Sequence, residues 1–409
     1  MKKYDLIIVG GGISGVAGAV SAARQGLSVL IIEKFGCLGG ALCNSLVYPF
    51  MRHTTSGEHR KVLSAGIFAE MKQRHADYGD PSWETFKFVF DDMTEEAGVD
   101  VLFHSTVFEV QTQGRKLTSL SVATKSGILH FEADYFLDAS GDGELLTMAH
   151  CDYQLGRESD GLCQPMTTCF RMNGVDIPLF QQERAELTKL YNQKQAEGSI
   201  QNPRENILVF YGQGKDILHL NTTRVVKLNP VDAFEVSKAE QIARKQVYEM
   251  FQFLKTNAKS CANASIIYIA NHIGVRESRK LKGEYILTGS DLLNLVHFED
   301  TIAVAAYEID IHNPAGTGTT IHMFRGSDYY YIPYRSLLPR EYDNMLVAGR
   351  CLSADHEAHS AVRVMPTCAC MGEAAGTAFA VAKETGTNAH TVDIALVRER
   401  LKNAGAVVD

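Results

Sequence analysis

Three glycines near the amino terminus, Gly10, Gly12 and Gly15, stand in the spacing G-x-G-x-x-G, and Glu33 ends the next apolar run. Glycines in this spacing permit a sharp turn, a close approach of phosphate to backbone, and tight packing of a helix on a strand. A carboxylate at Glu33 can accept hydrogen bonds from both ribose hydroxyls, whereas a 2′-phosphate would require a basic group. These residues predict a site for the pyrophosphate and ribose of a dinucleotide.

A second cluster with chemical potential lies near the carboxyl terminus and contains His356, His359 and Arg363. Histidine exchanges protons near neutral pH, and a guanidinium binds a carboxylate through two parallel hydrogen bonds. The cluster could therefore hold an anionic or hydroxyl-rich substrate and act as acid or base. Alternatively, these side chains bond to each other and to a cofactor. The histidines are three residues apart and not four, so the sequence predicts no metal site.

Arg276, Glu277 and Arg279 form a third polar group. Alternating charges commonly mark a solvated face of ion pairs. Arg276 or Arg279 could instead face a pocket and clamp an anion, because guanidinium matches a carboxylate bidentately. Both interpretations stay open, and we count Arg276 and Arg279 among the candidate catalytic residues.

The elements around the glycines are those that a dinucleotide site needs. A strand is expected from Leu6 to Val9, a helix from about Ser14 to Gln25, and a second strand from Ser28 to Ile32. Downstream, apolar spacing predicts helices near Ser64 to His75 and Trp83 to Ala97, and a buried strand at Val99 to Phe103.

Three alternating runs then predict a β-meander: Val107 to Thr112, Thr118 to Thr124 and Ile128 to Phe131. A further strand, Tyr135 to Ala139, ends on Ser140-Gly141. A plain NAD dehydrogenase would continue with βα units at this point. A meander here is typical of a flavin-binding Rossmann domain.

The middle of the chain changes character. Strands are expected around Cys169 to Met172 and Asp216 to Leu220, with a long helix after Pro230 to about Lys255. The aromatic residues of YYYIPY, Tyr329 to Tyr334, suit a pocket wall or a core equally. Closer to the end we expect a strand at Asn344 to Ala348 and an Ala/Gly-rich helix at Met371 to Thr385, closed by Gly386.

Length and composition limit the function classes. A chain of 409 residues predicts two domains, and a formal charge of −8 with no basic patch predicts no nucleic-acid or membrane partner. We expect an α/β fold: an FAD/NAD(P)-binding Rossmann-like domain with a meander at 1–150 and 336–409, and an inserted α+β substrate domain at 151–335. The odd number of cysteines, nine, predicts a reducing, cytoplasmic location without a disulfide framework.

Several motifs together carry a family resemblance: VGGGISGVAGA, EKFGCLGG, LDASGDGE, GVRESRKLKGEY, YEIDIHNP, YYIPYRSLLP, NMLVAGRCLSADHEAH and RVMPTCACMGEAAGTA. Through them the chain resembles FAD-dependent oxidoreductases, glutathione-reductase-like Rossmann flavoproteins that are distantly related to the fumarate reductase and succinate dehydrogenase flavoproteins. The resemblance covers essentially the whole chain. Asp310, His312 and Arg335 lie in these motifs without a clear role.

The resemblance implies FAD as the cofactor. Its pyrophosphate would lie at the glycine turn, its adenosine ribose on Glu33, its adenine against the backbone of Val107, and its flavin over Gly39 to Ala41. A helix starting near Gly372 would point its amino terminus at the flavin O2 edge, where a reduced flavin carries negative charge. The full set of expected cofactor contacts is Gly10, Gly12, Ile13, Ser14, Gly15, Glu33, Lys34, Gly39, Gly40, Ala41, Val107, Ala139, Ser140, Gly141, Gly349, Arg350, Gly372, Ala374 and Gly376.

Two features of the cysteines stay open. Cys37 and Cys43 flank Gly39-Gly40, as in the redox disulfide of glutathione-reductase-like enzymes, but their interval is one residue too long, and inert packing thiols are the alternative. Cys368 could be reactive beside the flavin helix or simply packed. Cys368-x-Cys370 has no second pair for zinc.

We therefore expect an FAD-dependent oxidoreductase that transfers a hydride between flavin N5 and a small polar or anionic organic substrate. Only one dinucleotide fingerprint is present, so NAD(P)H bound transiently, the substrate, or a redox protein would supply the electrons. The alternatives are an NAD(P)-dependent dehydrogenase and a non-catalytic flavin-binding protein.

Overall fold

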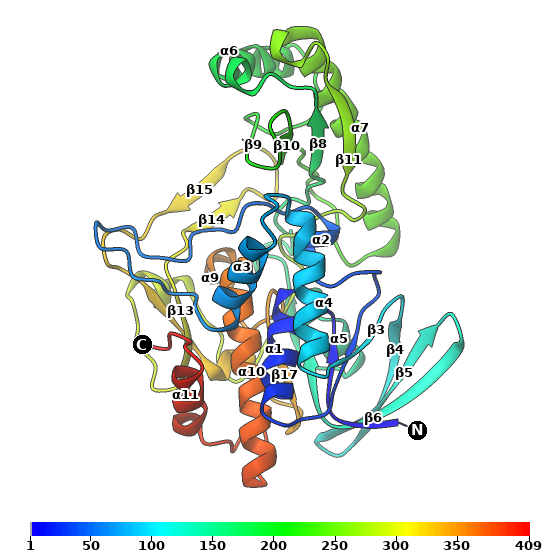
Figure 1. Cartoon of the computed structure of the whole chain (residues 1–409), viewed down its shortest axis with the longest axis vertical. Helices are drawn as coiled ribbons and strands as arrows, with labels where there is room; N and C mark the ends of the chain where they lie inside the picture. Colours follow the sequence, from blue (N-terminus) through cyan, green and yellow to red (C-terminus); the bar gives the residue numbers. More distant parts are fainter. Residues whose placement is uncertain (1) are drawn as a thin grey trace.

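The centre of the molecule is a seven-stranded sheet, and the computed structural model describes residues 2–409 (Figure 1). β1 (Lys2–Val9) lies between β2 (Val29–Ile32) and β6 (Gly127–Asp138), and the three strands run parallel. β3 (Asp100–Leu102) adds to β2, and β17 (Met345–Val347) adds to β6, also in parallel. The expected Rossmann-like fold class is confirmed.

The meander is present and joins the same sheet. β4 (Thr106–Gln113) and β5 (Lys116–Thr124) pair antiparallel, and β5 pairs with the first half of β6. The expected strands at 128–131 and 135–139 are therefore one continuous strand, because the apolar alternation does not stop at the acidic residues between them. Asp134 faces outward there and pairs with Lys3 of β1 at 2.8 Å.

The expectation of a buried strand at 99–103 is also corrected. β3 pairs only with β2, at the edge of the sheet as the structure describes it, and its residues are exposed or half-buried. The apolar residues of β3 are those of an edge strand that the rest of the protein covers only in part.

Two helices far apart in sequence pack side by side on one face of the sheet. α1 (Ile13–Arg24) follows the glycine turn, and α10 (Met365–Thr385) comes from the carboxyl end. α10 begins six residues before the expected start at Met371, because Pro366 suits the first turn of a helix and the small residues after it continue the helix. Gly372 is consequently inside the helix and not at its start.

The contact between α1 and α10 depends on glycine. A Cβ added at Gly372 would lie 2.0 Å from the carbonyl oxygen of Ser14, and one at Gly376 would lie 2.2 Å from that of Gly18. The two backbones thus touch with no side chain between them.

A second unit, which we call the cap (residues 170–269), forms the upper part of Figure 1. Its α6 and α7 pack on a four-stranded antiparallel sheet and share an apolar core separate from that of the central sheet. α6 was not expected from the sequence, although Asp176 caps it and Pro178 occupies its first turn. The cap elements are β8 (Phe170–Asn173), α6 (Ile177–Ala196), β9 (Val209–Phe210), β10 (Leu218–Leu220), α7 (Ala233–Asn257) and β11 (Ser265–Ile269).

The remaining segments are short. The helices are α2 (Ala41–Asn44), α3 (Ile67–Asp77), α4 (Phe86–Glu96), α5 (Glu144–Met148), α8 (Gly289–Leu293), α9 (His356–Val362) and α11 (Ile394–Asn403). Three two-stranded ladders complete the chain: β7 (Tyr153–Leu155) with β12 (Arg279–Leu281), β13 (Thr301–Ala305) with β16 (Tyr330–Pro333), and β14 (Ile309–His312) with β15 (Thr319–His322).

The aromatic cluster belongs to the core. Tyr330 and Tyr334 are buried, and the apolar residues of β13 and β16 pack in the same cluster as those of α1 and α10. The domain boundary at 335 stays a prediction of the sequence.

We predict that Gly376→Ala destabilises the protein, because the added methyl group meets the Gly18 carbonyl. Overpacking of this kind costs about 1–3 kcal/mol. Thermal unfolding should show a lower midpoint, while Gly316→Ala, whose methyl group would meet nothing within 4 Å, should leave it unchanged. Equal midpoints for the two variants would contradict the close helix contact.

A second prediction concerns Glu373 of α10, which is 1% exposed and accepts a hydrogen bond from the Ile67 amide at 3.1 Å. Burial raises its pKa from 4.5 to about 7. Between these pKa values the folded protein holds a proton that the unfolded chain has released, so this carboxyl group makes stability fall as pH rises across that window. Glu373→Gln should remove this loss and gain up to about 3 kcal/mol over wild type between about pH 5 and pH 8, measured by denaturant unfolding. A constant difference between the two proteins would contradict the shift.

Candidate functional site

A single cavity of about 880 Å³ links the glycine turn to the underside of the cap. Glu33 and Gly12 line one end, Gly40 and Gly349 the middle, and Arg276 the other end. Segments from both termini and from the cap therefore meet in one space.

The glycine end has the shape that a pyrophosphate needs. A Cβ at Gly12 would meet only the Gly40 Cα, at 3.9 Å, so this backbone is open to the cavity, whereas a Cβ at Gly15 would lie 2.0 Å from the Gly10 carbonyl oxygen. Gly15 thus serves helix packing, as expected, and does not line the cavity. Among residues 2–409, the buried hydroxyl of Ser14 has no hydrogen-bond partner, although it lies on the cavity wall. An amide-rich helix start with an unpartnered hydroxyl fits a phosphate.

Glu33 ends β2 and faces the same space. Its carboxylate accepts hydrogen bonds from the amides of Gly11 at 2.7 Å and Phe35 at 2.8 Å. Burial raises its pKa. Each oxygen keeps a lone pair, so the carboxylate can still accept bonds from two ribose hydroxyls.

Most of the expected cofactor contacts line the cavity: Gly10, Gly12, Ile13, Ser14, Glu33, Lys34, Gly39, Gly40, Ala41, Val107, Ala139, Ser140, Gly141, Gly349 and Arg350. Gly15, Gly372, Ala374 and Gly376 are absent from the lining, and all four are buried within helices. The residues that border the cavity at the true start of α10 are Val364 and Met365.

The basic side chains near the glycine end are already paired. Lys34 Nζ lies 2.6 Å from Glu144, and Arg350 Nη2 lies 2.8 Å from Asp142. Arg350 also donates to the Ser278 hydroxyl at 2.8 Å. These cations are therefore held in place and largely neutralised by the protein itself.

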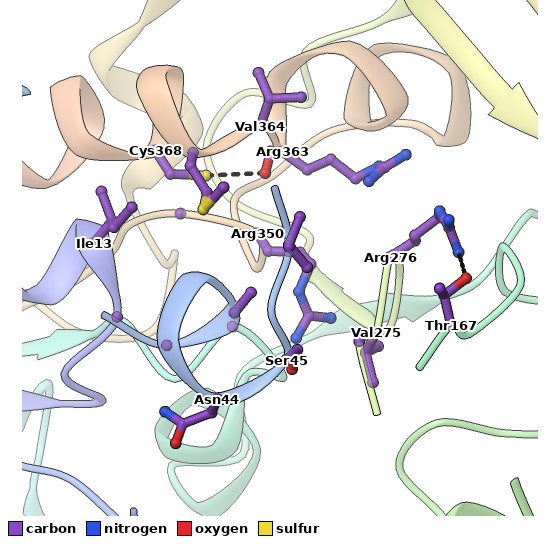
Figure 2. A pocket seen from close by; sticks show the side chains of 18 of the residues that line it. Ile13, Asn44, Ser45, Thr167, Val275, Arg276, Arg350, Arg363, Val364 and Cys368 are labelled. Carbon is purple, nitrogen blue, oxygen red and sulfur yellow. Dashed lines mark hydrogen bonds between the residues drawn. The ribbon is translucent and has the colours of Figure 1, made fainter. Parts of the chain in front are cut away.

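Two of the five candidate catalytic residues face the cavity, Arg276 and Arg363. Figure 2 shows Arg363 extending from the end of α9 toward the side on which Arg276 lies. Arg276 Nη1 donates to the Pro165 carbonyl and the Thr167 hydroxyl, both at 2.6 Å, and Arg363 has one long contact, 3.4 Å, with the Gln164 amide oxygen.

The other three candidates lie outside the lining. His359 is fully buried; burial lowers its pKa, and its Nε2 bonds to the Arg350 carbonyl at 2.8 Å. His356 Nδ1 bonds to Glu277 at 2.9 Å. Arg279 donates to the Asp142 carbonyl at 3.2 Å and stacks on Tyr153. These contacts position the walls of the cavity, and the catalytic roles of the three residues stay predictions.

Glu277, the acid of that polar group, is completely buried with Lys280, which donates to it. Burial opposes its ionisation, but the hydrogen bond from His356 and the charge of Lys280 lower its pKa to about 2. The alternating charges at 276–280 thus form an internal network and not a solvated face.

Sequence reasoning missed the cap side of the cavity. Arg204, from the loop between α6 and β9, is 5% exposed and lines the cavity, and its Nε donates to Asn206 at 3.1 Å. Tyr307, Asp310 and His312 line the cavity beside it. No sequence pattern indicates Arg204 or Tyr307 as site residues, because each stands alone in a segment without regular secondary structure.

Tyr307, Asp310 and His312 form a hydrogen-bonded group. The Tyr307 hydroxyl donates to Asp310 at 3.0 Å, and His312 Nε2 lies 3.4 Å from the same oxygen. His312 Nδ1 accepts from Arg224 at 3.0 Å. Burial opposes ionisation of Asp310, but His312, Arg363 and Tyr307 hold its pKa well below the usual range, and burial lowers the pKa of His312 to about 3. An ionised Asp310 thus faces a neutral His312.

The cap end is strongly positive. Within the described ranges, Arg204, Arg276 and Arg363 have no carboxylate within 4.0 Å. Burial and repulsion from Arg363 and Arg204 lower the pKa of Arg276 to about 9. Arg204 is buried and Arg276 and Arg363 are half-buried, and guanidinium groups in such positions without counter-charges favour an anion in the space between them.

The cysteines are all free thiols. Cys43 lowers the pKa of its neighbour Cys37, but neither lines the cavity, and their redox pairing stays a prediction. Cys368 lines the cavity, donates to the Arg363 carbonyl at 3.2 Å, and burial raises its pKa to about 12 (Figure 2).

Over residues 2–409, no group of three or more His, Cys, Asp or Glu side chains is arranged to hold a metal ion. No single helix in that range has the length and apolar character to cross a bilayer; α9 and α10 reach that length only as a pair bent by 91°.

Known proteins resemble this chain in sequence and in fold. A family model for FAD dependent oxidoreductases matches residues 5–401. Glutathione reductase of Debaryomyces hansenii is 38% identical over 101 residues, which cover 21% of this chain and 18% of that protein. NADH:fumarate oxidoreductase of Klebsiella pneumoniae is 49% identical over 39 residues, 10% of this chain and 4% of that protein. The chain thus matches less than a fifth of the length of either relative.

Among solved structures, the flavin-dependent brominase Bmp2 aligns with 98% of this chain and 84% of its own, with a TM-score of 0.50 and 12% identity. This likeness concerns the fold alone. The family match carries further, because it spans nearly the whole chain. The chain belongs to the FAD dependent oxidoreductase family, and its cofactor is FAD.

Proposed function

We propose that the protein transfers a hydride between its flavin and a small anionic organic molecule bound at the cap end of the cavity. The observation that carries the proposal is the pair Arg276 and Arg363, two cavity-facing guanidinium groups without carboxylate partners among the described residues. Since a cation that is half removed from water is stabilised by a counter-charge, an anionic substrate would supply the charge that the protein does not.

Residues along the cavity would contact the pyrophosphate, the ribose and the flavin of the cofactor. The start of α1 and the Ser14 hydroxyl would hold the pyrophosphate, Glu33 the ribose, and Gly39 to Ala41 would border the flavin. When bound, FAD supplies a site that accepts or donates two electrons with a hydride. The start of α10, at Val364 and Met365, would place its positive end beside the same region.

Hydride transfer to or from a carbon that bears oxygen also moves a proton, and the cavity holds a group for that step. Tyr307 presents a hydroxyl whose hydrogen is directed at Asp310, 3.0 Å away. Because this hydrogen is held by the ionised Asp310, the phenolic oxygen can accept a hydrogen bond from a substrate hydroxyl and orient the proton that leaves with the hydride. Arg276 and Arg363 would orient the substrate meanwhile, and the buried walls exclude water. The electron partner belongs to the proposal as well: NAD(P)H or a redox protein.

We predict that Glu33→Arg lowers the amount of bound FAD, because a cation replaces the acceptor of the ribose hydroxyls. Purified protein should show a reduced ratio of flavin absorbance near 450 nm, the approximate band of oxidised flavin, to protein absorbance. Glu186→Arg, at a site with 76% side-chain exposure on α6, is the matched control and should keep full flavin content. Unchanged flavin in Glu33→Arg would contradict the placement of the ribose.

We also predict that Arg276→Gln and Arg363→Gln slow reduction of the flavin by substrate while FAD stays bound. Each removes one charge-assisted contact, worth about 1.5–3 kcal/mol, or roughly tenfold to a hundredfold in rate. The test is an anaerobic screen of organic anions, with NADH and NADPH included, read as bleaching of the flavin. Arg60→Gln, on the exposed surface, is the control. Bleaching by neutral molecules alone, at equal rates in all variants, would refute an anionic substrate.

A further inference from the structure

The cap end of the cavity holds more positive charge than one carboxylate can balance. Four guanidinium groups cluster there, those of Arg204, Arg224, Arg276 and Arg363, and their charges act on one another. The carboxylates that face them are those of Glu205 and Asp310. The described part of the chain thus leaves an excess of two positive charges at this end.

Neither carboxylate forms an ion pair with Arg204, Arg276 or Arg363, the lining arginines that have no carboxylate within 4.0 Å among the described residues. Glu205 lies 3.6 Å from Arg224, which is 1% exposed and donates to the Gly316 and Gly318 carbonyls at 3.1 Å. Asp310 is held by Tyr307 and His312. Arg204, Arg276 and Arg363 are left facing the space with donors available.

The excess is not explained by the phosphates of FAD. Those are expected at the opposite end, where Lys34 and Arg350 are already paired with Glu144 and Asp142. Arg204 comes from the cap, which lies above the central sheet and α1 in Figure 1. We therefore assign the unbalanced charge to the cap end of the cavity, the space that Arg204, Arg276 and Arg363 face, which we call the substrate chamber.

We propose that this chamber takes a compact dianion, with one negative group on Arg276 and Arg363 and the second on Arg204. The proposal rests on the proposed function and names the substrate class for the same site. A monoanion would leave a buried guanidinium without a counter-charge, and a trianion would add a negative charge to a chamber that already contains Glu205 and Asp310.

Neutral polar groups also line the substrate chamber. The Asn221 side-chain oxygen lines the cavity and has no partner within residues 2–409, and the hydroxyls of Thr167 and Thr319 lie on the same wall. An acceptor such as the Asn221 oxygen suits a substrate hydroxyl beside the charged groups. A dicarboxylate and a phosphate monoester both satisfy this pattern, and they differ in shape.

The first test needs no variant. The FAD-loaded protein is titrated with acetate, oxalate, malonate, succinate and inorganic phosphate at matched ionic strength, and binding is followed by thermal unfolding and by changes in the flavin spectrum. We expect at least one dianion to bind about tenfold or more tightly than acetate, because it engages one additional guanidinium. The best ligand distinguishes the two sources: a dicarboxylate of one length, or phosphate. Equal affinity for acetate and every dianion overturns the proposal.

The second test assigns the second charge to Arg204. Arg204→Gln should weaken the best dianion by about tenfold or more and leave acetate within about twofold, whereas Arg60→Gln should change neither. Equal losses for acetate and dianion would reduce Arg204 to a general source of positive potential and overturn its assignment. Should Arg204→Gln fold poorly, Arg204→Lys keeps the charge without the bidentate fork and should show a smaller loss for the dianion.

The outcomes separate this inference from the proposed function. Anions that bind and depend on Arg276 and Arg363, but show no preference for two charges, keep the anionic site and reject the dianion. Loss of all anion dependence on Arg276 and Arg363 rejects the proposed function itself, whatever Arg204 contributes.

Discussion

The direct contact between the backbones of α1 and α10 is the constraint on which the rest of the site depends. Because Gly372 and Gly376 carry no side chains, α10 lies against Ser14 and Gly18. The segment that leads into α10 must therefore pass beside the glycine turn, and it carries Gly349, Arg350 and Arg363 into the same cavity as Glu33. Because Gly372 and Gly376 lack a side chain, residues more than 300 positions apart in the sequence become neighbours.

A separate constraint governs the charges. At the glycine end, Lys34 and Arg350 each have an acidic partner, so the start of α1, and not a free cation, is what this end offers to a phosphate. At the cap end, the hydrogen bonds of Arg276 and Arg363 go to neutral oxygens, which orient the guanidinium groups but leave their charge. The two ends of one cavity thus differ in electrostatics as well as in shape, and this difference separates cofactor from substrate.

The local elements were predictable where a short sequence pattern determines the structure directly. The turn Gly10 to Gly15, the strand before it and the acid after it each follow from one short segment, and the structure places them as expected. The glycines of α10 were misassigned, because sequence spacing does not reveal whether a glycine faces a ligand or another backbone. The motif that contains His359 likewise does not reveal that its ring is fully buried and lies outside the cavity lining, and its catalytic role stays a prediction. Arg204 gave no signal, since its position depends on how the whole cap folds over the sheet.

The half-buried Arg276 and Arg363 have an energetic consequence for the free protein. Moving a guanidinium out of water costs several kcal/mol unless a partner compensates it, and Arg276 meets repulsion from Arg363 and Arg204 in addition. A core selected for stability alone would replace such a group with an apolar side chain or add an acid. The fold does the latter for Lys280, whose partner Glu277 is equally buried, and for Arg350. Arg276 and Arg363 have no such acid, although other cations in the same wall do. A purely structural role does not explain this difference, whereas the binding of an anion explains it.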